Sequence, residues 1–317
     1  MTARVRFALR AGFTRSGLLI PAGCAMHTMA ASFREHTMSD APPRYAVFGH
    51  PIGHSLSPVI HRAFAQQLGL VIDYQALDLA PEVFATAARA FFAAGAKGAN
   101  VTLPHKAAAL ALADRRSAEA LRAGSANVLT RGDDGAIAAH STDGDGLVRD
   151  LTERYRVDLR GHDALLLGAG GAARAAAFAL IDAGVRSLTV VNRTATAADA
   201  LVDALGQPGR ARSRYWADLG SIGTFDLVLN ATAAGVLGQR LDLPFGLLAD
   251  RALCYDLSYG TAAGDFLAWA RAGGARYAFD GLGMLVETSA LSFAHWHGQR
   301  PDGEAVFQAL RAQYPQA

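Results

Sequence analysis

The 317-residue chain is 51% hydrophobic and 18% charged, with a formal net charge of +2. This length and composition predict about two domains with sizeable cores and exclude an intrinsically disordered chain. The small net charge gives no reason to expect nucleic acid or an anionic membrane as a partner. No apolar run in the sequence reaches the roughly 18–20 residues that a membrane span requires.

Cysteine usage bears on the cellular compartment. The chain has two cysteines, Cys24 near the start and Cys254 in a predicted buried strand. This placement argues against a disulfide framework and fits a reducing compartment. We therefore expect a cytoplasmic protein, and we expect no metal site.

Residues 1–38 are considered separately because they are rich in arginine and poor in acidic residues. The apolar stretch Gly17–Ile20 loosely resembles part of a transit or secretory segment, but Pro21 interrupts it and no clear cleavage site follows. We favour a disordered leader, or a start assigned too early with Met38 as the working start. The recognisable fold is expected to begin at Tyr45.

From Tyr45 onward, strand and helix patterns alternate, which predicts an α/β fold with parallel sheets. Ser57 and Pro58 are expected to open the first helix, with Ser57 as its cap, and Gly69 to end it. The other elements expected in this part are strands at Tyr45–Phe48, Asp73–Leu79 and Gly98–Leu103, a helix from Pro81 to Gly95, and a hairpin of Ala126–Arg131 with Ala136–Ser141.

A second unit is expected after a helix at Gly144–Tyr155. The apolar run Asp163–Leu167 has the length of a strand and suits one that is covered on both faces. A glycine-rich turn, a helix to Ala183 and a strand at Ser187–Asn192 complete a βαβ unit. Further predicted elements are strands at Phe225–Asn230, Leu253–Leu257 and Arg276–Ala278 and helices at about Leu282–His297 and Gly303–Tyr314.

The glycine-rich turn carries a dinucleotide fingerprint, Gly168-x-Gly170-x-x-Ala173. Glycines let the backbone turn tightly and approach a pyrophosphate, whose charge then lies at a helix N-terminus. The pattern alone is weak, but here it follows a predicted strand and opens a predicted helix. The alternative is a tight strand-to-helix turn that binds nothing.

The next predicted strand ends in Asn192-Arg193-Thr194. At this place an NAD site usually has Asp or Glu, which binds the ribose 2′-hydroxyl. A guanidinium and a hydroxyl suit the 2′-phosphate of NADP, which a carboxylate would repel. The sequence therefore favours NADP(H) as cofactor; the alternative is that Arg193 only caps the strand at the surface.

Lysine occurs only at Lys97 and Lys106, so arginine supplies 28 of the 30 basic residues. Lysine, unlike arginine, can release its proton once it is desolvated or placed near other charges. Lys106 follows a predicted strand, where the sites of α/β proteins gather, whereas Lys97 precedes that strand and is expected to be solvated. This bias is suggestive only, since a lone lysine is usually a surface charge.

Two further segments are candidates for chemistry. Asp143 lies in Ser141-Thr142-Asp143-Gly144, where it suits either a helix cap or a proton-transfer partner for a lysine. Ser55 and Ser57 place two hydroxyls beside a helix N-terminus, which suits a carboxylate ligand. The alternative for the serines is capping by Ser57 alone.

Taken together, these motifs resemble the shikimate dehydrogenase family over roughly residues 44–312. The segments that carry the resemblance, in chain order, are Ser55-Leu56-Ser57-Pro58 with His61, Asn100–Pro104 with Lys106, Ala126-Asn127, Thr142-Asp143-Gly144, the Gly168 loop, Asn192-Arg193-Thr194, Asn230-Ala231-Thr232 and Asp280–Leu285. The resemblance implies a substrate domain of residues 44–143 plus 282–317, with a Rossmann-type NADP-binding domain of residues 144–281 inserted. It also implies reversible NADPH-dependent reduction of 3-dehydroshikimate to shikimate, as in chorismate and aromatic amino-acid biosynthesis.

The resemblance also implies roles for individual residues. Lys106 and Asp143 would be the catalytic pair. The substrate-binding residues would be Ser55, Ser57, Thr102, Lys106, Asn127, Asp143, Tyr259 and the position of Thr288. The cofactor-binding residues would be Gly168, Ala169, Gly170, Gly171, Ala172, Asn192, Arg193, Thr194, Ala231, Thr232, Gly281 and Met284.

Two positions depart from the family pattern. Thr288 stands where the family usually has a Gln that bonds a substrate hydroxyl, so that contact is lost or bridged by water, at a cost of about 1–2 kcal/mol in binding. Ala197 stands where a second Arg is common, which is expected to weaken the NADP preference about tenfold without reversing it. The replacement of the usual Thr-Pro near Phe266 by Gly264-Asp265 has no interpretation.

Three alternatives remain open at this point. A quinate/shikimate dehydrogenase with relaxed substrate or cofactor use is the nearest. A non-catalytic NADP-binding regulatory protein needs no Lys–Asp pair. A quinone oxidoreductase or a folate dehydrogenase shares the nucleotide loop but does not explain Ser-x-Ser-Pro. The partner expected is a small-molecule substrate, with no nucleic acid and no membrane, in a monomer or homodimer.

Overall fold

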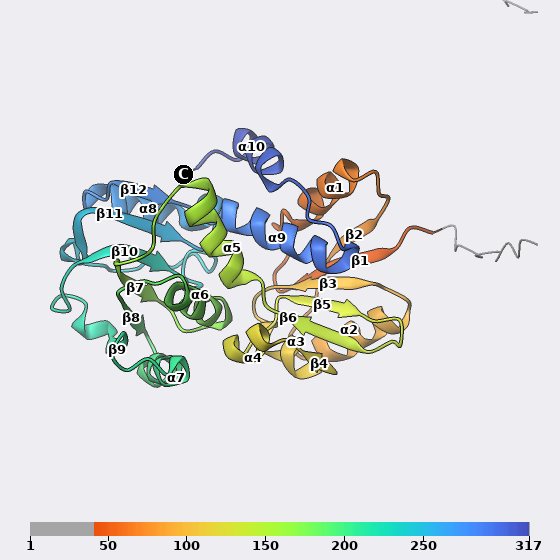
Figure 1. The fold of residues 1–317 in the computed structure, drawn as a ribbon, viewed down its shortest axis with the longest axis horizontal. Helices are drawn as coiled ribbons and strands as arrows, with labels where there is room; N and C mark the ends of the chain where they lie inside the picture. Colours follow the sequence, from red (N-terminus) through yellow and green to blue (C-terminus); the bar gives the residue numbers. More distant parts are fainter. Residues whose placement is uncertain (1–40, 317) are drawn as a thin grey trace, which may run out of the picture. The chain divides into compact units, whose positions relative to one another are not determined.

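The computed structural model describes residues 41–316, whose strands form two six-stranded sheets (Figure 1). The leader expected over residues 1–38 lies outside the described residues. Among residues 41–316, no helix combines the length and apolar character of a membrane span. The α/β fold class predicted from the alternation of strands and helices is confirmed.

The first sheet has the strand order β2-β1-β3-β5-β6-β4. β1 pairs in parallel with β2 and β3, whereas β5 runs antiparallel to β3 and to β6. β4 pairs in parallel with β6, so the sheet is mixed, and the predicted parallel arrangement holds for β2, β1 and β3 and for the β6–β4 pair but not for β5. Its strands are β1 (Arg44–Gly49), β2 (Asp73–Asp78), β3 (Gly98–Val101), β4 (Arg115–Arg116), β5 (Val128–Arg131) and β6 (Ile137–His140), and its helices are α1 (Ser57–Gln67), α2 (Phe84–Ala93), α3 (Lys106–Leu112) and α4 (Ala118–Ala123).

The second sheet has the order β12-β11-β10-β7-β8-β9, and every neighbouring pair is parallel. Counted from β7, this is the order 3-2-1-4-5-6 of doubly wound dinucleotide-binding folds. The strands are β7 (Asp163–Leu167), β8 (Ser187–Asn192), β9 (Ala211–Tyr215), β10 (Phe225–Asn230), β11 (Leu248–Asp256) and β12 (Tyr277–Phe279).

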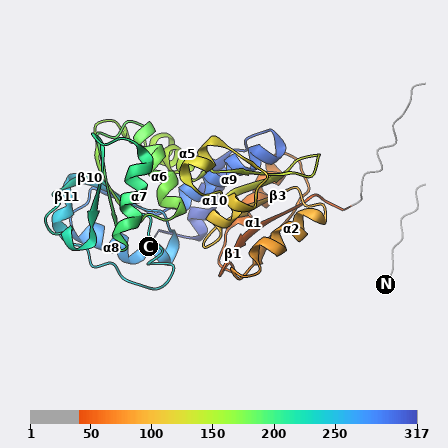
Figure 2. The same cartoon turned by 90° about the horizontal axis from the view of Figure 1, so that it is seen from below.

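Helices cover both faces of the second sheet. α6 (Gly171–Asp182) and α7 (Ala195–Leu205) pack on one face (Figure 2), and α8 (Gly264–Ala272) packs on the other. The apolar core strands β7 and β10 are buried along both faces, as the continuous run Ala164–Leu167 predicted. Short 3₁₀ turns, η2 (Trp216–Asp218), η3 (Phe245–Leu247) and η4 (Gly260–Ala263), complete this part.

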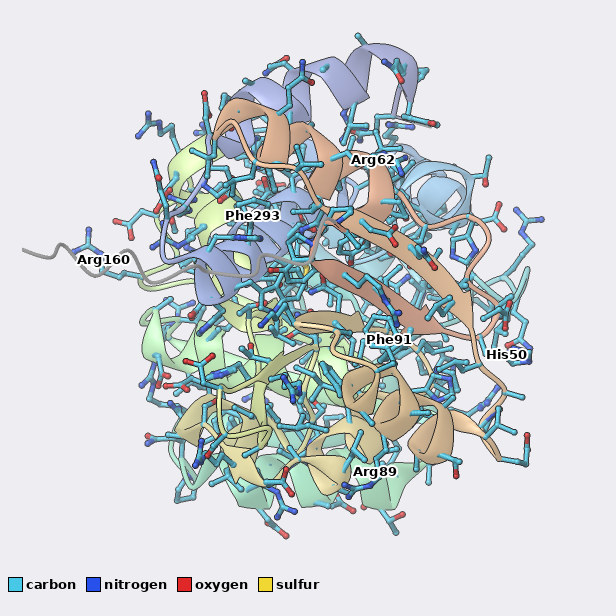
Figure 3. The ribbon with its side chains drawn as sticks, turned by 90° about the vertical axis from the view of Figure 1, so that its right-hand side faces the viewer. His50, Arg62, Arg89, Phe91, Arg160 and Phe293 are labelled. Carbon is cyan, nitrogen blue, oxygen red and sulfur yellow. The ribbon has the colours of Figure 1, made fainter. Side chains whose placement is uncertain are left out.

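Four elements connect the two sheets: α5 (Asp143–Arg149), the π-helical turn η1 (Asp150–Arg154), α9 (Leu282–His297) and α10 (Gly303–Gln313). α9 and α10 share an apolar cluster with α1, although the C-terminal helices lie more than 200 residues away in sequence. The residues from the C-terminal end that join this cluster are Leu282, Val286, Ala290, Phe293, Val306, Phe307 and Leu310. Phe293 of α9, labelled in Figure 3, packs against the rings of His61 and Phe64 in α1, with ring centroids 6.0 and 5.9 Å away.

A buried charged cluster fixes η1 against α9 and α10. Arg154 is ion-paired with Asp150 in its own turn, with Glu287 of α9 at 2.8 Å and with Glu304 of α10 at 2.8 Å. The hydroxyl of Tyr255 donates to Asp150 at 2.6 Å. Burial raises the pKa of Asp150 to about 6, against the opposing effect of these partners.

Several predicted boundaries are corrected by the structure. The cap of α1 is Leu56, and the cap makes no side-chain hydrogen bond, so the prediction that Ser57 caps this helix is wrong. The second helix begins at Phe84, because residues 81–83 form a turn. The elements α3, β4, α4, α7 and β9 were not predicted, and neither were the 3₁₀ turns η2, η3 and η4.

Gly144 allows α5 to lie directly on α6. A Cβ atom at Gly144 would stand 2.6 Å from the carbonyl oxygen of Ala175 and 2.8 Å from the Cβ of Ala179. Both neighbours are held in α6, so neither can withdraw without moving the helix.

We expect Gly144→Ala to destabilise the protein by about 1–3 kcal/mol, because the added methyl group forces the two helices apart. Urea unfolding measures the change. Gly209→Ala is the matched control, since a Cβ there meets nothing within 4 Å, and it should stay within about 0.5 kcal/mol of the wild type. Equal stability of the two variants would contradict this packing.

Candidate active site

The two serines predicted to bind a carboxylate lie side by side before α1. The Ser55 hydroxyl donates to the Ser57 hydroxyl at 3.2 Å, and the Ser57 backbone N–H donates to the Ser55 oxygen at 3.3 Å. Ser57 is 5% exposed. With no acidic residue in the first turn of α1, both hydroxyls stand in the favourable field of the helix N-terminus.

Lys106 and Asp143 form a close ion pair. The Lys106 ammonium donates to the Asp143 carboxylate at 2.5 Å, and their side chains are 17% and 7% exposed. Lys106 is the first residue of α3 and Asp143 the first residue of α5. The structure therefore brings together the two residues predicted as the catalytic pair, from positions 37 apart in the chain.

Asn127 holds the aspartate of this pair. Its amide nitrogen donates to the Asp143 carboxylate at 3.1 Å and to the Thr142 hydroxyl at 3.0 Å. Its amide oxygen accepts the Thr142 backbone N–H at 2.8 Å. Both amide hydrogens are thus engaged, which leaves one lone pair of the oxygen free to accept from a substrate hydroxyl.

A buried polar chain behind Asn127 was missed in the sequence. The Tyr74 hydroxyl donates to the Asn100 side-chain oxygen at 2.8 Å, and the Asn100 amide donates to the Ser292 hydroxyl at 2.8 Å and the Asn127 carbonyl at 3.3 Å. The Asn100-Val101-Thr102 motif was noted, but nothing in sequence spacing ties it to Tyr74 or Ser292. This chain fixes the backbone from which Asn127 projects.

The glycine loop has the geometry of a dinucleotide-binding turn. Gly168 adopts φ +112°, where only glycine is unstrained, and a Cβ there would lie 2.9 Å from the carbonyl oxygen of Ala231. Gly170 caps α6 without a side-chain hydrogen bond, and a Cβ there would meet nothing within 4 Å. The helix N-terminus is therefore open for a pyrophosphate, at the switch point between β7 and β10.

The glycine loop also lies next to the lysine. A Cβ added at Gly171 would stand 3.4 Å from the Cβ of Lys106 and 3.0 Å from the Ser125 hydroxyl. The Ser125 hydroxyl donates to the Gly171 carbonyl at 3.2 Å. Ser125 was not predicted, although it precedes the Ala126-Asn127 motif. The Lys106–Asp143 pair thus stands at the open end of α6.

The remaining predicted cofactor residues surround the carboxyl ends of the second sheet. Arg193 and Thr194 are exposed after β8, and the Asn192 amide donates to the Thr194 carbonyl at 3.0 Å. After β10, the Asn230 side-chain oxygen accepts from the backbone N–H and the hydroxyl of Thr232 at 3.1 and 2.8 Å. These contacts set the shape of the loop that passes Gly168.

Gly281 and Met284 lie where the second sheet meets α9. A Cβ at Gly281 would collide with the carbonyl oxygen of Leu257, and the Gly281 N–H donates to the Ser258 carbonyl at 2.8 Å. Met284 is 6% exposed and packs in the core of the second sheet. Tyr259 packs against the apolar cluster that contains Leu56, which places it beside the two serines. Among the residues described by the structure, no three His, Cys, Asp or Glu side chains are placed to hold a metal ion.

Comparison with known proteins identifies the family. The model of the shikimate dehydrogenase substrate binding domain matches residues 47–129, and that of shikimate / quinate 5-dehydrogenase matches residues 150–237. The chain is 56% identical over 271 residues to a shikimate dehydrogenase (NADP(+)) of Xanthomonas campestris and 54% identical over 273 residues to one of Xylella fastidiosa. These alignments cover 85% and 86% of the chain and 95% and 96% of the relatives. The chain belongs to the shikimate dehydrogenase family.

A solved structure of the family has the same fold. Shikimate 5-dehydrogenase of Thermus thermophilus, in complex with NADP(H) and shikimate, is 34% identical and superimposes with a TM-score of 0.74. The match covers 85% of this chain and 99% of that chain.

Against the pattern of the shikimate dehydrogenase family, Thr288 is a local departure. Its hydroxyl donates to the Met284 carbonyl of its own helix at 2.7 Å. A Cβ at Gly146 would collide with that hydroxyl, so α5 passes directly over Thr288. The hydroxyl hydrogen of Thr288 is therefore used in a hydrogen bond within α9, and the Thr288 hydroxyl can act toward a ligand only as an acceptor.

Asp256 holds the loop that follows Asn230, and its carboxyl group has an unusually high pKa. Its carboxylate accepts from the Asn230 amide at 2.8 Å and from the Ser258 N–H at 2.7 Å, and it is fully buried. Burial raises the pKa of Asp256 from 3.8 to about 7.

Because the folded state keeps this proton up to about pH 7 and the unfolded state loses it near pH 4, the stability contributed by Asp256 falls as pH rises through that window. Asp256→Asn removes this titration. We expect its stability relative to the wild type to rise by roughly 2–4 kcal/mol between pH 4.5 and pH 8, whatever its constant cost. Urea unfolding of both proteins at several pH values measures this difference, and parallel pH profiles would rule out the shifted titration.

Proposed function

We propose that this chain catalyses the reversible NADPH-dependent reduction of 3-dehydroshikimate to shikimate. The observation that carries the proposal is the largely buried Lys106–Asp143 pair beside the N-terminus of α6. A Cβ atom added at Gly171, the first residue of α6, would lie 3.4 Å from the Cβ of Lys106. A cofactor bound on α6 and a substrate held by Ser55 and Ser57 would both reach this pair. Membership of the family and its NADP-dependent relatives support the same reaction.

The substrate-binding roles follow from the donors and acceptors present. Ser55 and Ser57 are proposed to bind the carboxylate, because two hydroxyls at a helix N-terminus favour an anion. Asn127 is proposed to accept from a ring hydroxyl with its free lone pair while it orients Asp143. Thr102 and Tyr259 complete the proposed substrate site. Thr288 contributes at most an acceptor, which is expected to weaken substrate binding.

Lys106 is proposed to handle the proton. During reduction, Lys106 Nζ or a water donates a proton to the oxygen that was the carbonyl oxygen, and in the reverse direction it accepts that proton. Asp143 holds Nζ in place through the 2.5 Å contact and balances its charge. NADPH, when bound, supplies the hydride for the carbon that bears the oxygen. The low exposure of the pair excludes water and strengthens these interactions.

The cofactor site is proposed to consist of the predicted residues around the second sheet. The open N-terminus of α6, with Gly168–Ala172, would hold the pyrophosphate. Arg193 and Thr194 would bind the 2′-phosphate, since both side chains are exposed at the end of β8. Ala231 and Thr232 flank Gly168, and Gly281 and Met284 line the side toward α9.

The predicted domain division also remains a proposal. A substrate domain of residues 44–143 plus 282–317 is supported by the first sheet and by the packing of α9 and α10 on α1. An NADP-binding domain of residues 144–281 is supported by the second sheet. A cytoplasmic location, supported by the use of only two cysteines, and a monomer or homodimer are proposed as well.

We expect Lys106→Met to lower kcat/KM for shikimate and NADP by about 10²–10⁴, because the proton donor and acceptor is lost. The formation of NADPH, followed by its absorbance, measures the rate. Lys97→Met is the matched control, since it removes the chain's other lysine, and it should change the rate less than twofold. Undiminished turnover in Lys106→Met would exclude this mechanism.

We expect Arg193→Ala to lower the ratio of kcat/KM for NADP to kcat/KM for NAD about tenfold or more, because one guanidinium–phosphate contact is lost. Arg160→Ala is the control. Arg160 is exposed, pairs with Asp158 and precedes β7, at the end of the sheet opposite to the proposed cofactor site. Equal kcat/KM for the two cofactors in the wild type would contradict the role of Arg193.

The second candidate function is that of a quinate/shikimate dehydrogenase with relaxed substrate or cofactor use. Thr288, whose hydroxyl is bonded to the Met284 carbonyl, favours relaxed substrate use, and Ala197 favours relaxed cofactor use. The same assay with quinate distinguishes the two. A protein that binds NADPH but turns over no substrate would instead be a regulatory binder, for which the buried Lys–Asp pair has no use.

A further inference from the structure

A second pocket lies at the far end of the first sheet from the Lys106–Asp143 pair. It has a volume of about 330 Å³ and is lined by residues of β1, β5, α9 and the loops before β2 and β3. β1 begins at this end, with the Lys97 N–H donating to the Arg44 carbonyl at 2.9 Å, and it finishes at the active-site end. Figure 3 views the molecule from the side on which β1 begins.

The wall of this pocket is aromatic. Tyr45, Trp296 and His297 line it, with ring centroids 4.9 Å apart for Tyr45 and Trp296 and 5.2 Å apart for Tyr45 and His297. Phe293 supports His297 from behind at 4.1 Å. Exposed Leu70 and Val71, which is 77% exposed, add apolar surface at the mouth. A flat, largely apolar ring suits such a wall.

Polar groups in the pocket have no partner within residues 41–316. Tyr45 is 4% exposed, and burial alone raises the pKa of its hydroxyl to about 12, since no hydrogen bond opposes this. The Thr130 hydroxyl and the His297 Nε2 are buried without a partner among the described residues. The Tyr45 hydroxyl is not among the atoms sealed from solvent, so it is the unpartnered polar group that a ligand in the pocket can reach and satisfy.

The charges at the mouth set the sign of the ligand. Lys97 and Arg131 line the pocket, and neither forms an ion pair within the described part of the chain. Asp133 is the one carboxylate among the pocket-lining residues that the structure describes. Burial lowers the pKa of His297, which keeps that ring neutral at pH 7. The balance of these charges is positive and favours a monoanion.

We propose that this pocket is a second binding site, for a small monocyclic aromatic carboxylate. The ring lies against Tyr45 and Trp296, and the carboxylate lies at Lys97 and Arg131. A polar substituent, or a carboxylate oxygen, reaches the Tyr45 hydroxyl. The volume of about 330 Å³ accommodates one ring with its substituents. The site does not depend on the proposed reaction.

Two rigid elements, α9 and β3, connect the pocket to the active site, so a ligand bound in the pocket can influence the active site from a distance. α9 carries Trp296 and His297 at one end and Met284 at the other, about 20 Å away along the helix axis. β3 leads from Lys97 and Gly98 to Thr102 and Lys106. Gly98 packs so closely on the Trp296 ring that a Cβ there would collide with it. A ligand on Trp296 therefore contacts α9 directly and acts on β3 through the contact between Trp296 and Gly98.

The presence of only two lysines gives a matched test. Benzoate is the probe, benzamide is its uncharged counterpart, and titration calorimetry of the full chain measures both. We expect benzoate to bind with a dissociation constant of about 1 mM or below and benzamide at least fivefold more weakly. Lys97→Met should weaken benzoate binding at least fivefold, and Lys106→Met should leave it within twofold of the wild type. Tyr45→Phe, which keeps the ring, should weaken it two- to tenfold.

Other outcomes overturn the proposal. Loss of benzoate binding in Lys106→Met but not in Lys97→Met would place the probe in the active site. Benzamide binding as tightly as benzoate would remove the carboxylate from the recognition. Absence of binding at about 20 mM benzoate, twentyfold above the expected dissociation constant, would mean that the pocket is not a site of this kind. Lys97→Met retains dehydrogenase activity under the proposal, so a folded variant is verified by its own turnover.

Discussion

Burying a lysine and an aspartate together is costly unless both are held in good geometry by further hydrogen bonds. The Lys106–Asp143 pair meets this condition only because α3 and α5 begin next to each other and the segment before β5 passes the same place. Asn127 joins Asp143 to Thr142, and Asn100 joins the Asn127 backbone to Tyr74 and Ser292. These groups come from the first sheet, α5 and α9, so the first sheet and α9 must both be in register before the ion pair is held in this way.

Close helix contacts bring the second sheet to the same place. α5 crosses α6 at Gly144 and α9 at Gly146, and η1 meets α9 at Gly283, where a Cβ would collide with Asp150. Small residues at these crossings let the backbones approach more closely than side chains would allow. The buried charges around Arg154 then fix the angle of α9 and α10. As a result, the glycine loop proposed to bind phosphate lies in contact distance of Lys106, with a Cβ added at Gly171 only 3.4 Å from the Cβ of Lys106.

Long apolar patterns could be predicted from the sequence, and short polar elements could not. The bounds of β8, β10 and α9 agree with the predictions, since each is a buried run with a clear end. β9, with Arg212 and Arg214, is a largely exposed edge strand that lacks this signal, and β4 has two residues. The site residues and the Lys106–Asp143 pair were expected from motifs, but the hydrogen bonds that hold them were not. The Thr288 hydroxyl turns back to the Met284 carbonyl because α5 occupies the space in front of it, and a sequence does not show such a crossing.

The apolar cluster shared by α1, α9 and α10 has a consequence for synthesis of the chain. On the ribosome, the strands of the second sheet emerge in full by Phe279 and have all their partners, so that sheet can form at once. α1, made more than 200 residues earlier, keeps Ile60 and Phe64 without their cover until residues 282–310 have emerged. The apolar face of α1, next to Ser55 and Ser57, is therefore the last part of the first half to be covered, and for most of translation it is a surface on which chaperones can act.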